Sequence, residues 1–182
     1  GAPLPTLRCA LPAGGRCVAY ASDASLVAAG LDDGSVVLLR VPSGGGGGGG
    51  GAGRGGSESL VLGSKGGGRA LEDIKFAPGT TAAAGGLLAC AGHERIIEVH
   101  RVIADARAPG GVRLSPVAAC RGHTGTVTHL DWSSDGKLLM SNCTAKEALY
   151  WTAATGKQQP AGRAAAAVTW ATYTCPHGFP AM

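Results

Sequence analysis

Residues 127–151 read VTHLDWSSDGKLLMSNCTAKEALYW, and this stretch decides the fold. Its apolar residues gather in three short runs, separated by Asp135-Gly136 and by Thr144-Ala145-Lys146. Short apolar runs bounded by Gly, Asp, Asn or Ser are typical of β-strands joined by tight turns. The stretch therefore predicts an antiparallel meander of strand, turn, strand, turn and strand.

The same pattern occurs twice more upstream. Residues 18–41 contain two apolar runs around Asp33-Gly34, a strong signal for a β-hairpin. Residues 73–102 repeat the same order of strands and turns. Tyr20, Phe76 and Trp132 lie 56 residues apart, and turn residues follow each of them. We expect these aromatics to occupy equivalent strand positions and to pack between neighbouring units, because large aromatics supply much of the buried apolar area.

Two insertions interrupt the repeat. Eight consecutive glycines at 44–51 carry no side chains to bury and are costly to order, so residues 44–57 are predicted to be a disordered loop. The middle unit has an Ala- and Gly-rich insertion near 80–86. Without these insertions, the unit approaches the roughly 40–45 residues of a four-stranded propeller blade.

The sequence therefore predicts an all-β fold of about three consecutive four-stranded antiparallel blades of a β-propeller. The expected parts are a first blade at 1–43, the loop at 44–57, a second blade at 58–104, a loop at 105–115, a third blade at 116–160 and the start of a further blade at 161–182. Three blades leave two open faces, whereas closed propellers use about 4–8 blades. We therefore expect a part of a larger propeller.

One segment carries a family resemblance. Gly122-His123, THLDWS at 128–133 and the closing Leu149-Tyr150-Trp151 resemble a WD-type repeat. Together with EALYW at 147–151 and WATYTCPHGF at 170–179, they are similar to the echinoderm microtubule-associated protein-like family. The resemblance implies a tandem WD-type β-propeller that binds tubulin or microtubules, in the cytoplasm, on the cytoskeleton and in cilia. The structural blade positions that it implies are Tyr20, Phe76, His123, Asp131, Trp132 and Trp151.

A full WD unit contains a hydrogen-bonded set of a His, a hydroxyl, a turn Asp and the closing Trp. Here the turn at 144–146 has no Asp to accept a hydrogen bond from His123. The resemblance therefore implies an incomplete set. His123 is then expected to find another acceptor or to face solvent, because a buried unpaired imidazole costs about 1–3 kcal/mol.

Composition narrows the classes of partner. The chain has 16 Lys and Arg against 12 Asp and Glu, for a net charge of +4, and the two signs are interleaved. This distribution does not indicate nucleic-acid binding. No apolar run approaches the roughly 18 residues of a membrane span. The six cysteines form no CxxC pair, so we expect reduced thiols rather than a disulfide framework.

Motifs for catalysis and cofactor binding are incomplete. Residues 51–56 match GxGxxG, but a glycine run precedes them where a dinucleotide site needs a strand. His93-Glu94 begins a zinc-peptidase pattern that ends in Ile97. The metal-capable residues lack a complete four-ligand spacing; they are Cys120, His123, Cys143, Cys175 and His177. We therefore expect no enzyme, no cofactor and no metal.

Two functional hypotheses remain. The first is a cytoskeletal scaffold that binds tubulin through the propeller; the second is a WD-type adaptor in another assembly, such as a ciliary or signalling complex, without tubulin contact. Basic surface residues are the candidates for contact with an acidic partner, although such residues usually form a solvated face. They are Arg121, Lys137, Lys146, Lys157 and Arg163.

Overall fold

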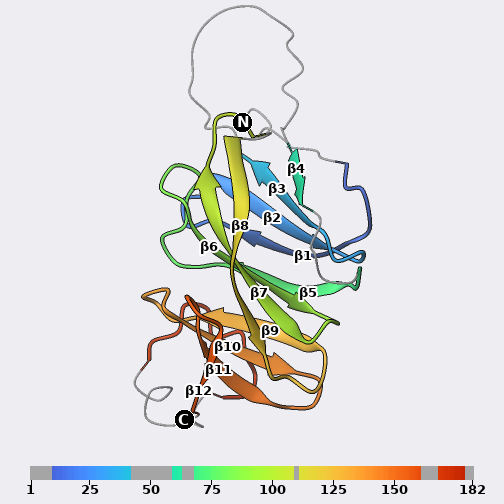
Figure 1. Cartoon of the computed structure of the whole chain (residues 1–182), viewed down its shortest axis with the longest axis vertical. Helices are drawn as coiled ribbons and strands as arrows, with labels where there is room; N and C mark the ends of the chain where they lie inside the picture. The colour runs from blue at the N-terminus through green and yellow to red at the C-terminus, as the bar shows by residue number, and fades with distance from the viewer. Residues whose placement is uncertain (1–9, 42–58, 63–67, 109–110, 161–167, 179–182) are drawn as a thin grey trace, which may run out of the picture.

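The computed structural model describes residues 10–41, 59–62, 68–108, 111–160 and 168–178, and of 59–62 it describes the backbone. These residues form three four-stranded antiparallel sheets (Figure 1). The prediction of an all-β fold with four-stranded antiparallel blades is confirmed. Within the described residues, no helix has the length and apolar character needed to cross a membrane.

Each sheet is a meander in which strands adjacent in sequence are hydrogen-bonded. The first sheet consists of β1 (Gly15–Tyr20), β2 (Leu26–Leu31), β3 (Val36–Arg40) and β4 (Ser59–Leu62). The second consists of β5 (Leu71–Phe76), β6 (Gly86–Gly92), β7 (Ile96–Ala104) and β8 (Val112–Arg121). The third consists of β9 (Val127–Trp132), β10 (Leu138–Cys143), β11 (Ala148–Thr152) and β12 (Lys157–Gln159).

Local sequence explains the turns. Between β2 and β3, the Asp33 carboxylate accepts hydrogen bonds from the backbone N–H and the hydroxyl of Ser35. Gly34 has a φ of 82°, a left-handed conformation that costs glycine little. The hairpin expected at Asp33-Gly34 is therefore present.

The three sheets share one register. Tyr20, Phe76 and Trp132 each end the first strand of a sheet, and they pair with Val27, Leu88 and Leu139 on the second strand. The connection after Phe76 is longer than the other two, because it contains the Ala- and Gly-rich insertion. The 56-residue spacing thus corresponds to the step from one sheet to the next.

The outer strands shift the blade boundaries from those expected. Residues 59–62 pair with β3, so they close the first sheet instead of opening a blade at 58. Strand β8 pairs with β7 and occupies the end of the expected loop, residues 112–115, as well as the start of the expected third blade. The reason is that Gly122-His123, which the repeat places near the start of the third blade, lies in the connection between two sheets. The residues just before this pair therefore belong to the outer strand of the preceding sheet. The loop predicted at 44–57 lies outside the described residues.

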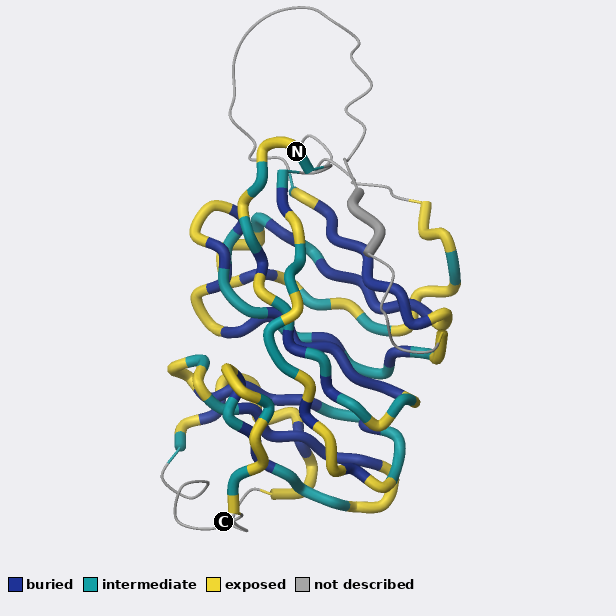
Figure 2. Tube along the Cα trace, in the orientation of Figure 1, coloured by how far each residue is buried: buried dark blue, intermediate teal, exposed yellow. Residues whose placement is uncertain are grey.

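The sheets are stacked face to face, and the cores lie between them (Figures 1 and 2). Between the first and second sheets, Leu26 and Leu38 pack with Ile74 and Leu88. Between the second and third sheets, Val99 belongs to a cluster with the third-sheet residues Leu130, Leu139 and Trp151. The segment 168–178 forms no strand, and it packs Trp170 and Cys175 against the far face of the third sheet. Neighbouring sheets are therefore joined by continuous apolar interfaces.

The three aromatics differ in burial. Trp132 is 1% exposed, and its indole N–H donates to the Lys75 carbonyl of the second sheet, 3.0 Å away. Phe76 is also buried against the first sheet. Tyr20 is 66% exposed, because no sheet in the described part of the chain lies against its side of β1. The expectation that all three aromatics pack between sheets is therefore wrong for Tyr20.

Candidate functional site

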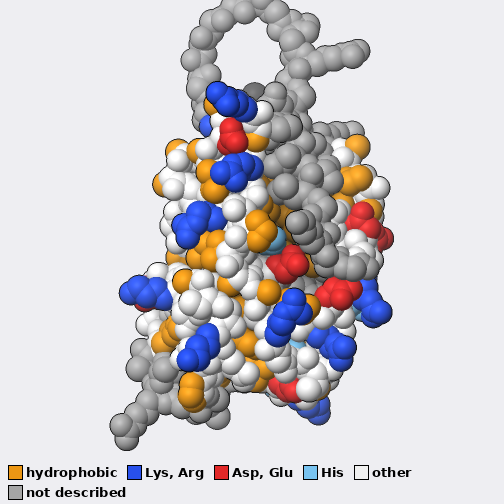
Figure 3. All heavy atoms as spheres, in the orientation of Figure 1, with side chains coloured by type: hydrophobic (Ala, Val, Ile, Leu, Met, Phe, Trp, Pro, Cys, Tyr) orange, Lys and Arg blue, Asp and Glu red, His pale blue; other side chains and the backbone are white. Residues whose placement is uncertain are grey.

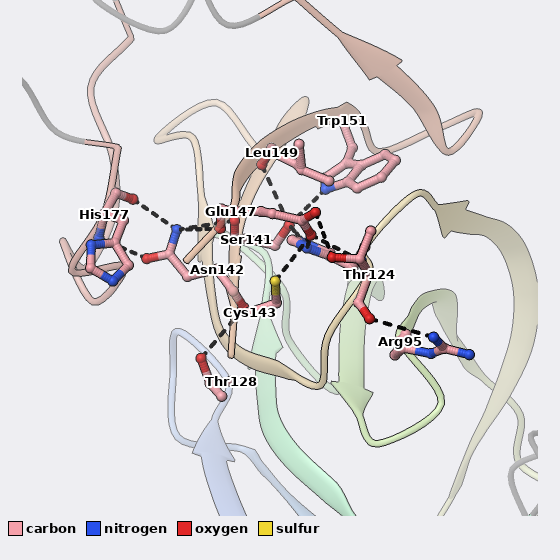
Figure 4. A network of polar contacts seen from close by, with 11 residues as sticks. Arg95, Thr124, Thr128, Ser141, Asn142, Cys143, Glu147, Leu149, Trp151 and His177 are labelled. Atoms are coloured by element: carbon pink, nitrogen blue, oxygen red, sulfur yellow. Dashed lines mark hydrogen bonds and ion pairs between the residues drawn. The ribbon is translucent and has the colours of Figure 1, made fainter. Parts of the chain in front are cut away.

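A polar network lies at one end of the third sheet, where two connections meet (Figure 4). His123 comes from the connection between β8 and β9, and Glu147 follows the turn between β10 and β11. Ser141 lies on β10 opposite Leu149, and Trp151 lies on β11. The register of β10 and β11 therefore brings the Ser141 hydroxyl and the Trp151 indole N–H close to the His123 imidazole, which lies beside the Glu147 carboxylate.

The network runs as a chain of hydrogen bonds. The Trp151 indole N–H donates to Ser141 Oγ at 2.8 Å, and Ser141 Oγ lies 2.7 Å from His123 Nε2. His123 Nδ1 lies 3.1 Å from Glu147 Oε2. Because a carboxylate can only accept, Nδ1 carries the proton, and Nε2 of the neutral ring accepts from the serine hydroxyl. His123 has found another acceptor, one of the two expected outcomes: the turn at 144–146 has no Asp, and Glu147, one residue beyond it, completes the set.

Electrostatics favour this arrangement of charges. The backbone N–H of Thr124, the Cys143 thiol and the Thr124 hydroxyl all donate to Glu147, and they hold the pKa of that carboxyl at about 2. Burial lowers the pKa of His123, and Glu147 opposes this effect in part. Both shifts favour a neutral imidazole beside an ionised carboxylate.

The arrangement of Ser141, His123 and Glu147 matches the order of a serine hydrolase triad. Ser141 is completely buried, however, and its Oγ already accepts the Trp151 N–H. A nucleophile needs a neighbouring space in which a substrate carbonyl can approach. The closed surroundings of Ser141 make the set a structural connection between two loops and two strands.

Two further side chains of the third sheet, those of Asn142 and Asp131, form hydrogen bonds with segment 168–178. The Asn142 side chain donates to the His177 carbonyl and accepts from its backbone N–H, both at 2.8 Å (Figure 4). Asp131 is fully buried, and its Oδ1 accepts from the backbone N–H and the hydroxyl of Thr172. Its Oδ2 has no hydrogen-bond partner among the described residues. These contacts thus fix the segment against the third sheet although it forms no strand.

A polar groove of about 400 Å³ lies beside the network, between connections of the second and third sheets. Arg95 donates from Nη1 to the Thr124 carbonyl at 3.4 Å, and Arg69 pairs with Glu94 at the same distance. A Cβ atom on Gly125 would lie 2.5 Å from Thr144 Oγ1, so glycine allows the two loops to approach. The lining residues are Arg69, His93, Glu94, Arg95, Thr124, Gly125, Thr126 and Thr144.

The structure separates most of the metal-capable residues considered from the sequence. His123 and Cys143 come together with Glu147, whereas Cys120 lies in the interface between the second and third sheets. Cys175 lies on the far face of the third sheet. The sequence did not predict the roles of Glu147 and Thr124 in the network. The signal available was the position of Glu147, an acidic residue directly after the turn at 144–146.

The basic residues considered as partner contacts are spread over the surface. Arg121, Lys137, Lys146 and Lys157 are exposed, and Arg163 lies outside the described residues. Figure 3 shows Lys and Arg side chains distributed over one face of all three sheets, with Asp and Glu among them. No concentrated basic patch is visible on this face, so the groove is the better-defined candidate for a contact.

Three stacked four-stranded meanders, the third of which carries a His, Ser and Trp network, define a segment of a WD-type β-propeller. The family model for the second β-propeller of echinoderm microtubule-associated protein matches residues 4–182. The chain therefore belongs to the echinoderm microtubule-associated protein family.

Individual relatives agree with this assignment. Human echinoderm microtubule-associated protein-like 3 is 31% identical over 166 residues, which are 91% of this chain and 16% of the relative. The 77 kDa echinoderm microtubule-associated protein of Strongylocentrotus purpuratus is 35% identical over 124 residues, which are 68% of this chain and 17% of the relative. The chain thus spans about one sixth of the length of these relatives, which are named for association with microtubules.

Proposed function

We propose that this chain is a non-enzymatic section of a microtubule-associated scaffold and that its parent protein binds tubulin polymers in the cytoplasm through the propeller. The observation that carries the proposal is the family match over residues 4–182. The packing is consistent with a scaffold role, because apolar interfaces join the sheets into a stack that presents its loops in fixed positions.

The groove beside the network is the contact surface that we propose. Its cations are Arg95, which stands on the turn between β6 and β7 and donates to the Thr124 carbonyl, and Arg69, which precedes β5 and pairs with Glu94. The chain carries a net charge of +4. Positive charge facing an acidic polymer accelerates association, and dissolved ions screen the attraction. Binding is therefore expected to weaken as salt concentration rises.

Co-sedimentation with microtubules tests the proposal. The full-length parent protein should pellet with polymer at low salt and much less at high salt. The double variant Arg69→Glu and Arg95→Glu should bind more weakly, whereas Lys137→Glu should bind like the parent. Lys137 precedes β10 and the groove residue Thr144 follows it, so the control charge lies at the other end of that strand.

The two parts of the proposal fail separately. Equal binding by the double variant and by the Lys137→Glu control would remove the groove as the contact surface. No binding by the full-length protein at low salt would overturn the tubulin proposal and favour an adaptor in another assembly, including a ciliary one.

A further inference from the structure

A second cluster of polar and sulfur-containing side chains lies in the second sheet, on the face that meets the first sheet. Cys90 on β6 pairs in register with Glu98 on β7, and His100 follows two residues later on the same face of β7. The Cys90 Sγ, a Glu98 carboxylate oxygen and a His100 ring nitrogen all lie within 4.8 Å of one another. Two hydrogen-bonded strands hold all three residues, so sheet register fixes their spacing.

The spacing of these atoms suits a tetrahedral metal. Zinc bonds of about 2.0–2.3 Å place neighbouring ligand atoms roughly 3.3–3.8 Å apart. His100 Nε2 already lies 3.3 Å from Glu98 Oε2. The Cys90 Sγ lies within 4.8 Å of a Glu98 carboxylate oxygen and of a His100 ring nitrogen. Thiolate sulfur, imidazole nitrogen and carboxylate oxygen are also the three donor types that zinc accepts in proteins.

Space for a fourth ligand adjoins the cluster. A cavity of about 30 Å³ is lined by Cys90 and Glu98, and its walls include Leu71 and Ile96. A polar cavity of roughly 10–15 Å³ or more is large enough for one water molecule. Three protein ligands with a water in the fourth position is a common coordination of zinc.

The charges of the cluster balance those of a dication. Cys90 is buried among apolar residues such as Leu88 and Val102, and burial raises the pKa of its thiol well above the usual range. A thiolate alone is therefore unfavourable at this position. When zinc binds, the Cys90 proton passes to solvent as the sulfur–zinc bond forms. One thiolate and one carboxylate then neutralise the two charges of the ion.

We propose that Cys90, Glu98 and His100 bind one Zn²⁺ in the interface between the first and second sheets, with a water as the fourth ligand. The other metal-capable cluster, at His123, Cys143 and Glu147, is less suited to an ion. Its carboxylate already accepts hydrogen bonds from Thr124 and from the other two members, and the second nitrogen of His123 is bonded to Ser141.

Metal titration of the purified 182-residue chain tests the site. Cobalt, used as a spectroscopic substitute for zinc, should give a thiolate-to-cobalt charge-transfer band that saturates at one equivalent. Zinc should displace the cobalt in competition with a chromophoric chelator. Cys90→Ala should abolish the band, and His100→Gln should weaken zinc binding at least tenfold. His100 and Glu98 are only partly buried, so His100→Gln and Glu98→Gln are the variants expected to keep the fold.

Cys143→Ala and His177→Gln are the matched controls, because one alters the other cluster and the other removes an exposed histidine that lies outside both the cluster and the cavity. Both should leave the band and the zinc affinity unchanged. Loss of the band in Cys143→Ala, with retention in Cys90→Ala, would place the ion beside His123 and overturn the proposal. A cobalt spectrum without a thiolate band, or equal zinc affinity in His100→Gln and the unmodified chain, would overturn it as well. Circular dichroism of each variant separates loss of binding from loss of fold.

Discussion

At the residue scale, Glu147 connects two loops and a strand through one carboxylate. It accepts hydrogen bonds from the Thr124 backbone and hydroxyl, from the Cys143 thiol and from His123. Hydrogen bonds to an ionised acceptor are roughly twice as strong as neutral ones. Removing this carboxylate would leave several donors without a partner, and one of them is the buried imidazole.

We expect Glu147→Ala to lower the free energy of unfolding by about 1–3 kcal/mol, the usual cost of leaving buried donors unpaired. Glu147→Gln should cost less, because its amide oxygen can still accept. Urea denaturation measures both. Glu94→Ala is the control, since Glu94 forms an exposed ion pair with Arg69 that should contribute less than about 1 kcal/mol. A loss in Glu147→Ala no larger than in the control would contradict the role assigned to the network.

The network also predicts a dependence of stability on pH. Burial lowers the pKa of His123 below its ordinary value of 6.5, so the unfolded chain takes up a proton that the folded chain resists. The stability present above the ordinary value is therefore lost as pH falls through 6.5 toward the folded pKa. The Glu147 contribution is lost only at lower pH, as the pH falls from its ordinary value of 4.5 toward its folded pKa of about 2.

Thermal unfolding between about pH 7 and pH 5 isolates the histidine contribution. The melting temperature of the unmodified chain should fall across this range, and His123→Gln should show a shallower fall. Parallel curves for the two proteins would show that His123 is not the group responsible.

At the scale of the element, the second and third sheets are each attached to the preceding sheet by one end of their first strand. Trp132 occupies the end of β9, where its ring is buried and its N–H bonds to β5. Tyr20 has the same register position on β1 and is exposed. The same strand position therefore contributes differently, depending on whether a neighbouring sheet covers it.

Trp132→Ala should reduce the free energy of unfolding by about 3–5 kcal/mol, the typical cost of removing a large buried side chain. Tyr20→Ala should change it by less than about 0.5 kcal/mol, as for most exposed positions. Chemical denaturation compares the two variants directly. Similar losses in both would mean that burial does not distinguish the two strand ends.

Short-range patterns made much of each sheet predictable. Asp33-Gly34 specifies a hairpin through local chemistry, and the aromatic spacing predicts the register of the first two strands. Strand β8 was not assigned to its sheet, because its pairing with β7 is decided by tertiary contacts. Glu147 was missed for a related reason: only the folded turn shows how far its side chain reaches. The Cys90 and Glu98 pair likewise needs the register of β6 and β7 to become visible.

At the scale of the whole molecule, interfaces make each sheet depend on its neighbour. All three tryptophans of the chain lie in the third sheet or in the segment that covers it; they are Trp132, Trp151 and Trp170. Phe76 lies in the interface between the first and second sheets. Tryptophan fluorescence therefore reports on one end of the stack, while far-ultraviolet circular dichroism reports on all sheets.

We expect one cooperative transition in which both signals have the same midpoint. Phe76→Ala should shift the fluorescence midpoint and the circular dichroism midpoint equally, although the nearest tryptophan belongs to another sheet. Urea titration followed by both signals provides the test. A fluorescence midpoint that stays in place while the other moves would show that the sheets unfold independently.

Several polar contacts between neighbouring sheets share one separation in sequence. Ser22 with Gly79, Ser25 with Ala82 and Leu130 with Asp73 each join residues 57 positions apart. Contacts of moderate and uniform range limit the chain entropy lost at each step. A nascent chain leaving the ribosome could therefore add each sheet to the one already formed, without waiting for distant segments. Translation from the N-terminus would then set the order of assembly, and each completed sheet would template the next.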